Sequence, residues 1–207
     1  MQAGINGVLA GCGNRQRPLI MIHIDQGGNR DNTKYFFDRI MGYGIEFERA
    51  NYNDWGVGDT QDCLHAAKYL RTFKEIKPDR IGIAGGSYGG YMTIASLSRD
   101  PEYLFACGVA KYGDSNLVSS WAQCDRNTRL YTEMQIGHPS DNWEVFIDGS
   151  SIHQVANIKS PLLLLHGLED EVVAPQASEE LAEALDMAGE LVKNDPEGQT
   201  LGRLLHY

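Results

Sequence analysis

The strongest chemical signal in the sequence is a serine set among glycines. Residues 85–90 read G-G-S-Y-G-G and contain the pattern G-x-S-x-G with Ser87 at its centre. Residues 80–84, which are apolar after Arg80, predict a strand before this pattern, and 89–98 has the character of a helix. A serine on such a sharp strand-to-helix turn projects its hydroxyl above the sheet, where the helix N-terminus favours developing negative charge. Ser87 is therefore the predicted nucleophile; the alternative is a glycine-rich turn with an incidental serine.

A serine nucleophile needs a base, and the base needs a third group that orients it. After a G-x-S-x-G turn the partners follow in the order acid, then histidine. Asp170 lies just beyond the apolar run 162–165, where the carboxyl end of a strand would place a triad acid. We predict Asp170 as that acid. A solvated acidic loop is the alternative interpretation, and it is the simpler one for the flanking Glu169 and Glu171.

Short apolar runs alternate with amphipathic stretches along the chain. Strands are expected at 19–24, 80–84, 105–110 and 162–165, and helices at 60–74, 89–98 and 178–188. This alternation predicts an α/β fold, with a mostly parallel sheet, helices on both faces and ligands at the carboxyl ends of the strands. With 207 residues and neither a linker nor a repeat, we expect a single domain over 1–207.

Composition and charge argue against several classes of protein. Lys and Arg number 18 against 28 Asp and Glu, and the resulting net charge of −10 argues against nucleic-acid binding. No apolar run approaches the roughly 20 residues of a membrane span. No ligand cluster or dinucleotide fingerprint predicts a metal or cofactor. The 4 cysteines form no C-x-x-C pair and favour reduced thiols in a cytoplasmic protein; the alternative is a processed secreted form. The oligomeric state stays open.

Four motifs occur together in this chain: G-Y-G at 42–44, D-W-G at 54–56, G-G-S-Y-G-G-Y at 85–91 and H-G-x-x-D-x-x-V at 166–173. The combination resembles the catalytic domain of the prolyl oligopeptidase family of serine hydrolases. The resemblance implies an α/β-hydrolase fold, here without the family's β-propeller, with Ser87 as nucleophile and Asp170 as triad acid. It also implies that the backbone N–H of Tyr88 is one oxyanion donor, and that the aromatic segment 121–131 lies over the site as a cap.

Three features depart from the family's pattern. Where the family has an HGGP-like loop with the second oxyanion donor, this chain reads H-I-D-Q-G-G from His23, which is either that donor or a strand-end histidine without a chemical role. A strand and an arginine-glycine turn are missing between residues 37 and 41, which would leave the 19–24 strand nearer a sheet edge. Gln199 stands where the family places its catalytic histidine, and glutamine cannot shuttle protons at neutral pH.

Of the three triad residues, the base is therefore the one that the sequence identifies least well. His206 is the one histidine that follows Asp170 in the sequence; it is either the base, if the end of the chain docks, or an exposed tail residue. The predicted function is a serine hydrolase that cleaves a small ester or short peptide by acyl transfer through Ser87, Asp170 and His206, without a cofactor. The alternative is a catalytically impaired α/β-hydrolase-like protein that lacks a general base.

Overall fold

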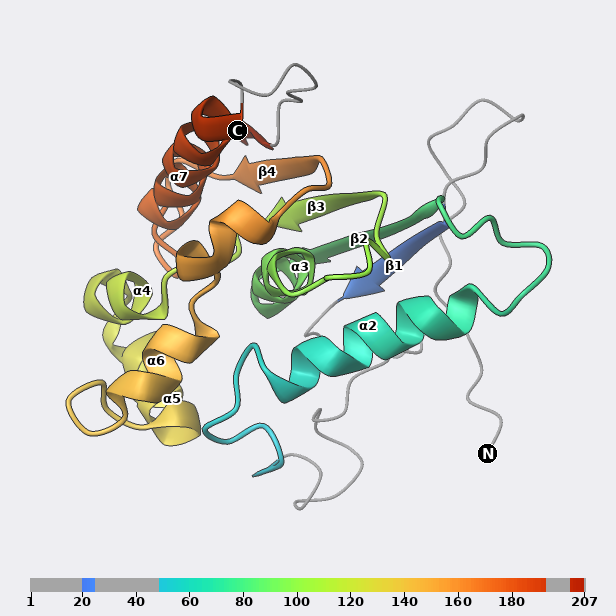
Figure 1. Ribbon diagram of the computed structural model, residues 1–207. Coiled ribbons are helices and arrows are strands. Elements are labelled where there is room, and N and C mark those ends of the chain that lie inside the picture. Colours follow the sequence, from blue (N-terminus) through green and yellow to red (C-terminus); the bar gives the residue numbers. More distant parts are fainter. Residues whose placement is uncertain (1–19, 25–48, 193–201, 207) are drawn as a thin grey trace.

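The computed structural model describes residues 20–24, 49–192 and 202–206 (Figure 1). Its strands form one parallel sheet in the order β1-β2-β3-β4-β5, so each strand pairs with the one that precedes it in the sequence. The strands are β1 (Ile20–Ile24), β2 (Ile81–Gly86), β3 (Cys107–Lys111), β4 (Leu162–His166) and β5 (Gly202–His206). The predicted α/β fold with a parallel sheet is thus confirmed. As the missing strand predicts, β1 is an edge of the sheet in the described part of the chain.

Helices make up most of the described residues between the strands. They are α2 (Gly58–Leu70), α3 (Tyr88–Ser98), α4 (Leu117–Gln123), α5 (Arg126–Ile136), α6 (Trp143–Gly149), the 3₁₀ helix η1 (Ser151–Asn157) and α7 (Gln176–Val192). Figure 1 shows two groups: α2, α3, η1 and α7 lie along the sheet, whereas α4, α5 and α6 stand beyond the ends to which the strand arrows point. The second group therefore covers the carboxyl ends of the strands.

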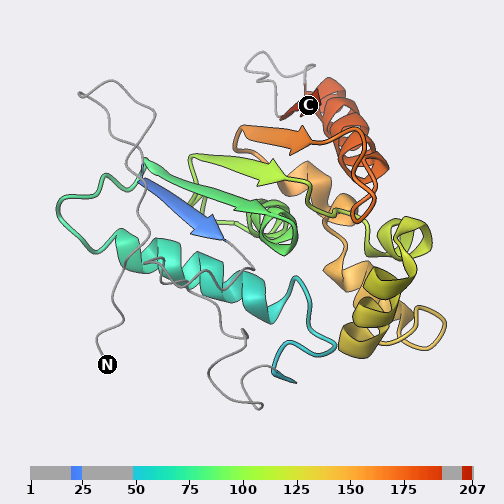
Figure 2. The same cartoon turned by 180° about the vertical axis from the view of Figure 1, so that it is seen from behind.

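The helices that lie along the sheet form one layer. α3 contacts β1, β2 and β3, and it touches α2 on one side and η1 on the other, while η1 touches α7 (Figure 1, Figure 2). Helices were expected on both faces; among the described residues they lie on one. The reason is the strand order, because right-handed crossovers in a sheet that grows in one direction place every connecting helix on the same side.

The core lies between this layer and the sheet. Ile81 and Ile83 of β2 have no exposed surface, and Met92 and Ile94 of α3 are equally buried. In β3 and β4, alternate residues are buried and half-buried, so one face of these two strands packs more tightly than the other. The packing of α3 fixes the start of this helix against β2 and β3, and that start is where Ser87 stands.

The middle of the chain carries helices that the sequence analysis did not predict. Two of them begin at polar N-caps: Asn116 accepts the N–H of Ser119 at 3.2 Å before α4, and Asp125 accepts the N–H of Asn127 at 2.7 Å before α5. Such caps satisfy N–H groups that have no acceptor within the helix. Strand β5 was also not predicted. The helix expected at 60–74 is α2, which ends at Leu70.

No helix in the described part of the chain is long and apolar enough to cross a membrane. The described side chains likewise include no group of three or more His, Cys, Asp or Glu that could hold a metal ion. Cys63, Cys107 and Cys124 are free thiols. The cytoplasmic location stays a prediction.

Candidate active site

Ser87 occupies a strained corner between β2 and α3. Its φ of 55° and ψ of −124° lie in a region that residues other than glycine rarely adopt. The N–H of Ser87 donates to the carbonyl of Lys111 at 3.0 Å, and its own carbonyl accepts the N–H of Tyr91 at 3.0 Å. The corner is therefore fixed from two sides, by the end of β3 and by the first turn of α3.

The hydroxyl of Ser87 does not cap the helix, although that is the common role of a serine at this position. Ser87 is the N-cap residue of α3, yet its side chain makes no capping hydrogen bond. The residue is partly exposed and lines a cavity. Ser87 thus stands at the wall of a cavity with no capping bond to its hydroxyl, a position that suits the predicted nucleophile.

Two glycines allow the backbone to come close together at this corner. A Cβ on Gly113 would lie 2.3 Å from the carbonyl carbon of Gly90, and a Cβ on Gly90 would lie 2.5 Å from the carbonyl oxygen of Lys111. Both contacts are with backbone atoms, so no side-chain rotation can relieve them. The start of α3 therefore packs directly against the turn after β3, which brings that turn next to Ser87.

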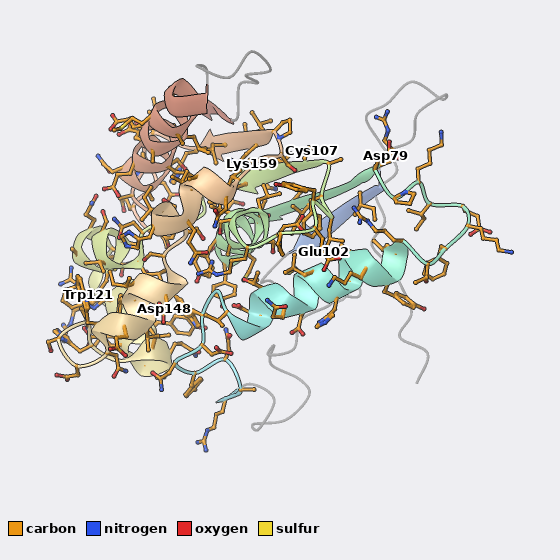
Figure 3. The ribbon with its side chains drawn as sticks, viewed as in Figure 1. Asp79, Glu102, Cys107, Trp121, Asp148 and Lys159 are labelled. Carbon is orange, nitrogen blue, oxygen red and sulfur yellow. The ribbon has the colours of Figure 1, made fainter. Side chains whose placement is uncertain are left out.

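A cavity of about 330 Å³ opens beside Ser87. Its walls come from the start of α3, the turn after β3, α4, α5 and the loop after β4. Trp121 of α4 lies at the opposite end of the molecule from Asp79, which precedes β2 (Figure 3). Four residues of the segment 121–131 line the cavity, as expected of a cap: Trp121, Asn127, Thr128 and Tyr131.

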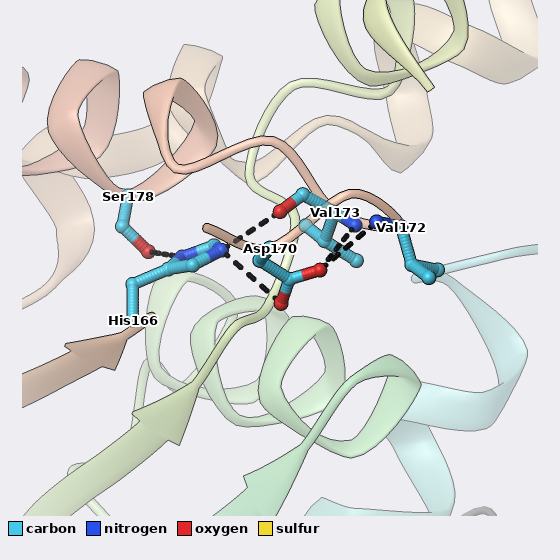
Figure 4. A network of polar contacts seen from close by, with 5 residues as sticks. All are labelled: His166, Asp170, Val172, Val173 and Ser178. Atoms are coloured by element: carbon cyan, nitrogen blue, oxygen red, sulfur yellow. Dashed lines mark hydrogen bonds and ion pairs between the residues drawn. The ribbon is translucent and has the colours of Figure 1, made fainter. Parts of the chain in front are cut away.

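The loop after β4 holds Asp170 where the sequence predicts it. The Oδ1 atom of Asp170 accepts the N–H groups of Val172 and Val173, each at 3.0 Å, and its Oδ2 atom lies 3.7 Å from Nε2 of His166 (Figure 4). The Asp170 side chain is 22% exposed. Val172 and Val173 line the cavity. The loop of the predicted acid and the predicted nucleophile therefore border the same cavity.

His166 supports this loop from inside the fold. The residue has no exposed surface. Its Nε2 atom donates to the carbonyl of Val173 at 2.9 Å, since a carbonyl can only accept, and its Nδ1 atom lies 2.7 Å from Oγ of Ser178 (Figure 4). A ring that is fully buried and bonded at both nitrogens has no atom left to contact a substrate. His166 is therefore not the missing base.

A second carboxylate, Asp114, lines the cavity together with Ser87. Its Oδ1 atom is buried and has no hydrogen-bond partner in the described structure, although the side chain of Ser120 hydrogen-bonds the carboxylate. Burial, together with the nearby charge of Asp170, raises the pKa of Asp114 from 3.8 to about 6. The sequence analysis missed this residue. The signal that identified Asp170, an acid soon after an apolar strand, also applies to Asp114.

Tyr88 is the first residue of α3, where backbone N–H groups have no acceptor within the helix. This position suits the predicted oxyanion donor. The ring is held in place because its hydroxyl donates to Oδ2 of Asp59 at 2.5 Å and accepts from Nδ2 of Asn51 at 2.8 Å. Burial and the charge of Asp59 raise the pKa of the Tyr88 hydroxyl well above its ordinary value, so the hydroxyl stays protonated.

His23 lies in β1, in register with Ala84 of β2. The next pair in the register joins Ile24 to Gly85, so β1 ends beside the corner that carries Ser87. A donor from the end of β1 would therefore enter the site from the side opposite β3. The predicted role of His23 as that donor stays a prediction.

His206 ends strand β5 and is in register with His166 of β4. It therefore belongs to the sheet and is not a free tail residue. The carboxyl end of β5 lies next to the strand end from which the Asp170 loop departs, which is the edge where a base has to approach. Gln199 lies outside the described residues. The role of His206 as the base stays a prediction.

A parallel sheet with a serine on a strained strand-to-helix corner and an acid loop two strands away defines an α/β-hydrolase-like site. The sequence profile of the prolyl oligopeptidase family matches residues 40–195. The chain belongs to this family.

Two curated relatives illustrate the relationship. An uncharacterized peptidase of Bacillus subtilis is 32% identical over 154 residues, which cover 73% of this chain and 23% of that protein. Venom dipeptidyl peptidase 4 of Vespula vulgaris is 33% identical over 177 residues, which cover 83% of this chain and 20% of that protein. The chain thus spans about a fifth to a quarter of the length of these relatives.

Solved structures agree with the fold. The crystal structure of puromycin hydrolase matches with a TM-score of 0.72 at 25% identity and covers 83% of this chain and 24% of that chain. An acylaminoacyl peptidase in complex with Z-Gly-Gly-Phe-chloromethyl ketone matches with a TM-score of 0.70 at 28% identity, over 83% of this chain and 26% of that chain. The likeness confirms the α/β-hydrolase fold.

Proposed function

We propose that this chain is the catalytic part of a serine hydrolase that cleaves peptide or ester bonds by acyl transfer. The observation that carries the proposal is the corner at Ser87. A positive φ at a non-glycine residue is costly, and here it coincides with a hydroxyl that makes no helix cap and lines a cavity. Strained backbone of this kind clusters at functional sites, where it supports a function and not stability.

In the proposed reaction, Oγ of Ser87 attacks a carbonyl carbon while a base removes its proton. Asp170 orients the base and stabilises it once it is protonated. The backbone N–H of Tyr88, with a second donor near His23, binds the oxyanion of the tetrahedral intermediate. The base then returns the proton to the leaving group, and water releases the acyl group from Ser87. His206 is the base in this proposal.

The substrate class follows from the relatives. They include dipeptidyl peptidases, a puromycin hydrolase and acylaminoacyl peptidases, one of them in complex with a peptide chloromethyl ketone. These names support a peptide substrate. The cavity of about 330 Å³ suits one small group, since sites for small molecules are about 300–1,000 Å³. We therefore propose short peptides and small activated esters as substrates.

The test is labelling with a fluorophosphonate probe, which reacts with activated serines. The native chain should be labelled, and Ser87→Ala should abolish the labelling. Ser140→Ala removes the hydroxyl of an exposed serine that does not line the cavity, so this matched variant should be labelled as the native chain is. Labelling that survives in Ser87→Ala would contradict the proposal.

A catalytically impaired protein is the second candidate, and the burial of His166 favours it. His166 is the histidine that lies nearest Asp170 in the sequence, and it is fully buried. Hydrolysis of p-nitrophenyl acetate distinguishes the two candidates. An active enzyme should exceed its Ser87→Ala variant in rate and should lose this excess in His206→Ala. Equal rates in the native chain and Ser87→Ala would favour the impaired protein.

A further inference from the structure

Among the described residues that line the cavity beside Ser87 there is one carboxylate and no Lys, Arg or His. Among the described residues that line it, Asp114 is the one that carries a formal charge at neutral pH. The Asp114 residue is partly exposed, but its Oδ1 atom is buried and lacks a hydrogen-bond partner. The Ser120 side chain bonds the same carboxylate and leaves that oxygen unsatisfied. The cavity thus carries a negative charge, and one oxygen of its carboxylate has no hydrogen-bond partner.

A buried carboxylate without a cation is an unfavourable arrangement. Buried charges in proteins are normally paired, and a carboxylate that loses its hydration without a partner costs several kcal/mol. No cationic side chain of the described residues forms an ion pair with Asp114. The guanidinium carbon of Arg129 lies 5.0 Å from the ring centroid of Trp121, and its Nε and Nη2 atoms donate to the carbonyls of Trp121 and Ala122.

The walls around Asp114 are rich in aromatic rings. The aromatic residues that line the cavity are Trp55, Tyr88, Tyr91, Trp121 and Tyr131. Trp55 packs against three of these rings, with centroid distances of 5.0 Å to Tyr88, 6.3 Å to Tyr91 and 6.5 Å to Tyr131. Aromatic faces attract a cation through their quadrupole, and the attraction strengthens when the cation is desolvated. Aromatic walls with one carboxylate favour an organic cation over a neutral group or an anion.

We propose that this cavity binds an organic cation, an ammonium or guanidinium group on the acyl part of the substrate, and that Asp114 is the residue that selects it. The inference rests on the proposed function for its link to the scissile bond. Ser87 and Asp114 line the same cavity, so a substrate whose carbonyl lies at Ser87 places its neighbouring group against the carboxylate. The cation neutralises the charge that the Asp114 carboxylate brings to the cavity.

Binding of two matched probes tests the site without any turnover. Phenylbutylamine and phenylbutanol share one carbon skeleton and differ in the ammonium group. Calorimetry on the native chain should show the amine to bind at least 10-fold more tightly than the alcohol. This preference should fall to about 1 in Asp114→Asn. Asp141→Asn removes the same charge at an exposed position and should keep the preference of the native chain.

Turnover of matched 4-nitroanilides shows which group of the substrate, the side chain or the α-amino group, supplies the cation. One pair compares N-acetyl-lysine with N-acetyl-norleucine, which tests a side-chain ammonium. The other pair compares alanine with N-acetyl-alanine, which tests the α-ammonium group. In one of the two pairs, kcat/KM for the cationic member should be at least 10-fold higher, and Asp114→Asn should remove this ratio. Asp141→Asn should leave it unchanged.

The outcomes separate this inference from the proposed function. Equal binding of amine and alcohol to the native chain would overturn the cation site, whatever the enzyme does. A preference for the amine that persists in folded Asp114→Asn would also overturn it. If the amine binds through Asp114 but neither the native chain nor Ser87→Ala hydrolyses any anilide or reacts with the fluorophosphonate, then the cation site stands and the hydrolase proposal fails.

Discussion

The Nε2 atom of His166 lies 3.7 Å from the Oδ2 atom of Asp170, and Val173 connects the two residues. The carbonyl of Val173 accepts the Nε2–H of His166, while the N–H of Val173 donates to Oδ1 of Asp170 (Figure 4). The buried end of β4 and the predicted acid are therefore joined by a closed set of polar contacts. A group that orients a base has to be held in place by its own neighbours. The N–H groups of Val172 and Val173 hold Asp170 directly, and His166 supports them through the carbonyl of Val173.

The buried partner of His166 offers a first prediction. Ser178→Ala removes the hydroxyl that lies 2.7 Å from Nδ1 of His166 and leaves that nitrogen buried without a partner. Such a loss costs about 1–3 kcal/mol. We expect urea unfolding to show a free energy of unfolding that is lower by this amount.

A second His–Ser pair on the surface provides the control. Nδ1 of His138 also lies 2.7 Å from Oγ of Ser140, but both residues are exposed. Because water replaces an exposed hydroxyl, Ser140→Ala should change the free energy of unfolding by less than about 0.5 kcal/mol. Equal effects of Ser178→Ala and Ser140→Ala would show that the buried pair does not stabilise the loop.

The charge of Asp170 can be separated from its place in the loop. In Asp170→Asn the side-chain oxygen can still accept the N–H groups of Val172 and Val173, so the loop should keep its shape while the charge is lost. We expect kcat to fall by about 10⁴-fold, as for other triads that lose this charge, with the free energy of unfolding nearly unchanged. Asp170→Ala should lower both quantities. Full activity in Asp170→Asn would exclude Asp170 as the triad acid.

The carboxylate of Asp114 predicts a pH dependence of stability. Its pKa is about 6 in the folded chain against an ordinary 3.8, so the folded chain holds the proton more strongly. The free energy of unfolding should therefore fall as the pH rises from about 4 to 6 and should stay at the lower level above pH 6. Asn cannot ionise, so the free energy of unfolding of Asp114→Asn should not fall in this way. Relative to the native chain, it should be higher at pH 8 than at pH 4 by roughly 1–3 kcal/mol.

Urea unfolding of both proteins at pH 4 and pH 8 gives the measurement. A difference between native chain and variant that does not change with pH would mean that Asp114 is not desolvated. Phenylbutylamine added at pH 8 should raise the stability of the native chain more than that of Asp114→Asn.

The close approach of Gly113 and Gly90 predicts that one added methyl group, in Gly113→Ala, strongly lowers the stability of the fold. In Gly113→Ala the new Cβ would lie 2.3 Å from the carbonyl carbon of Gly90, and the backbone of α3 would have to move. Overpacking of this kind costs about 1–3 kcal/mol even where side chains can adjust, and more is expected against backbone. Thermal unfolding should show a lower Tm, and fluorophosphonate labelling of Ser87 should weaken. Native stability in Gly113→Ala would contradict this geometry.

The sequence predicted the parts of the fold that rest on local patterns. The corner at Ser87 and the loop at Asp170 follow from short motifs beside apolar strands, and both were found where expected. The helix layer on one face could not be read in this way, because it depends on the order of strands in the sheet. Strand order is a long-range property that no single window of sequence contains.

The site was less completely predicted than the fold. Asp114 gave no motif of its own, and its importance comes from burial in a cavity whose walls are distant in sequence, such as Trp55 and Tyr131. His206 was interpreted as a base or a tail residue, but the structure places it in a strand paired with β4. Burial and pairing of this kind emerge when the chain packs, and the residue types alone do not encode them.

The strand order has a consequence for how this chain is made. Each described strand after β1 pairs with the described strand that precedes it in the chain, so the sheet can be extended at one edge as the polypeptide leaves the ribosome. Among the described strands, each one after β1 finds its first partner already translated. When the sheet assembles during translation, the edge that is still to be extended is that of the newest strand. A single unpaired edge on that side lowers the risk of aggregation during synthesis.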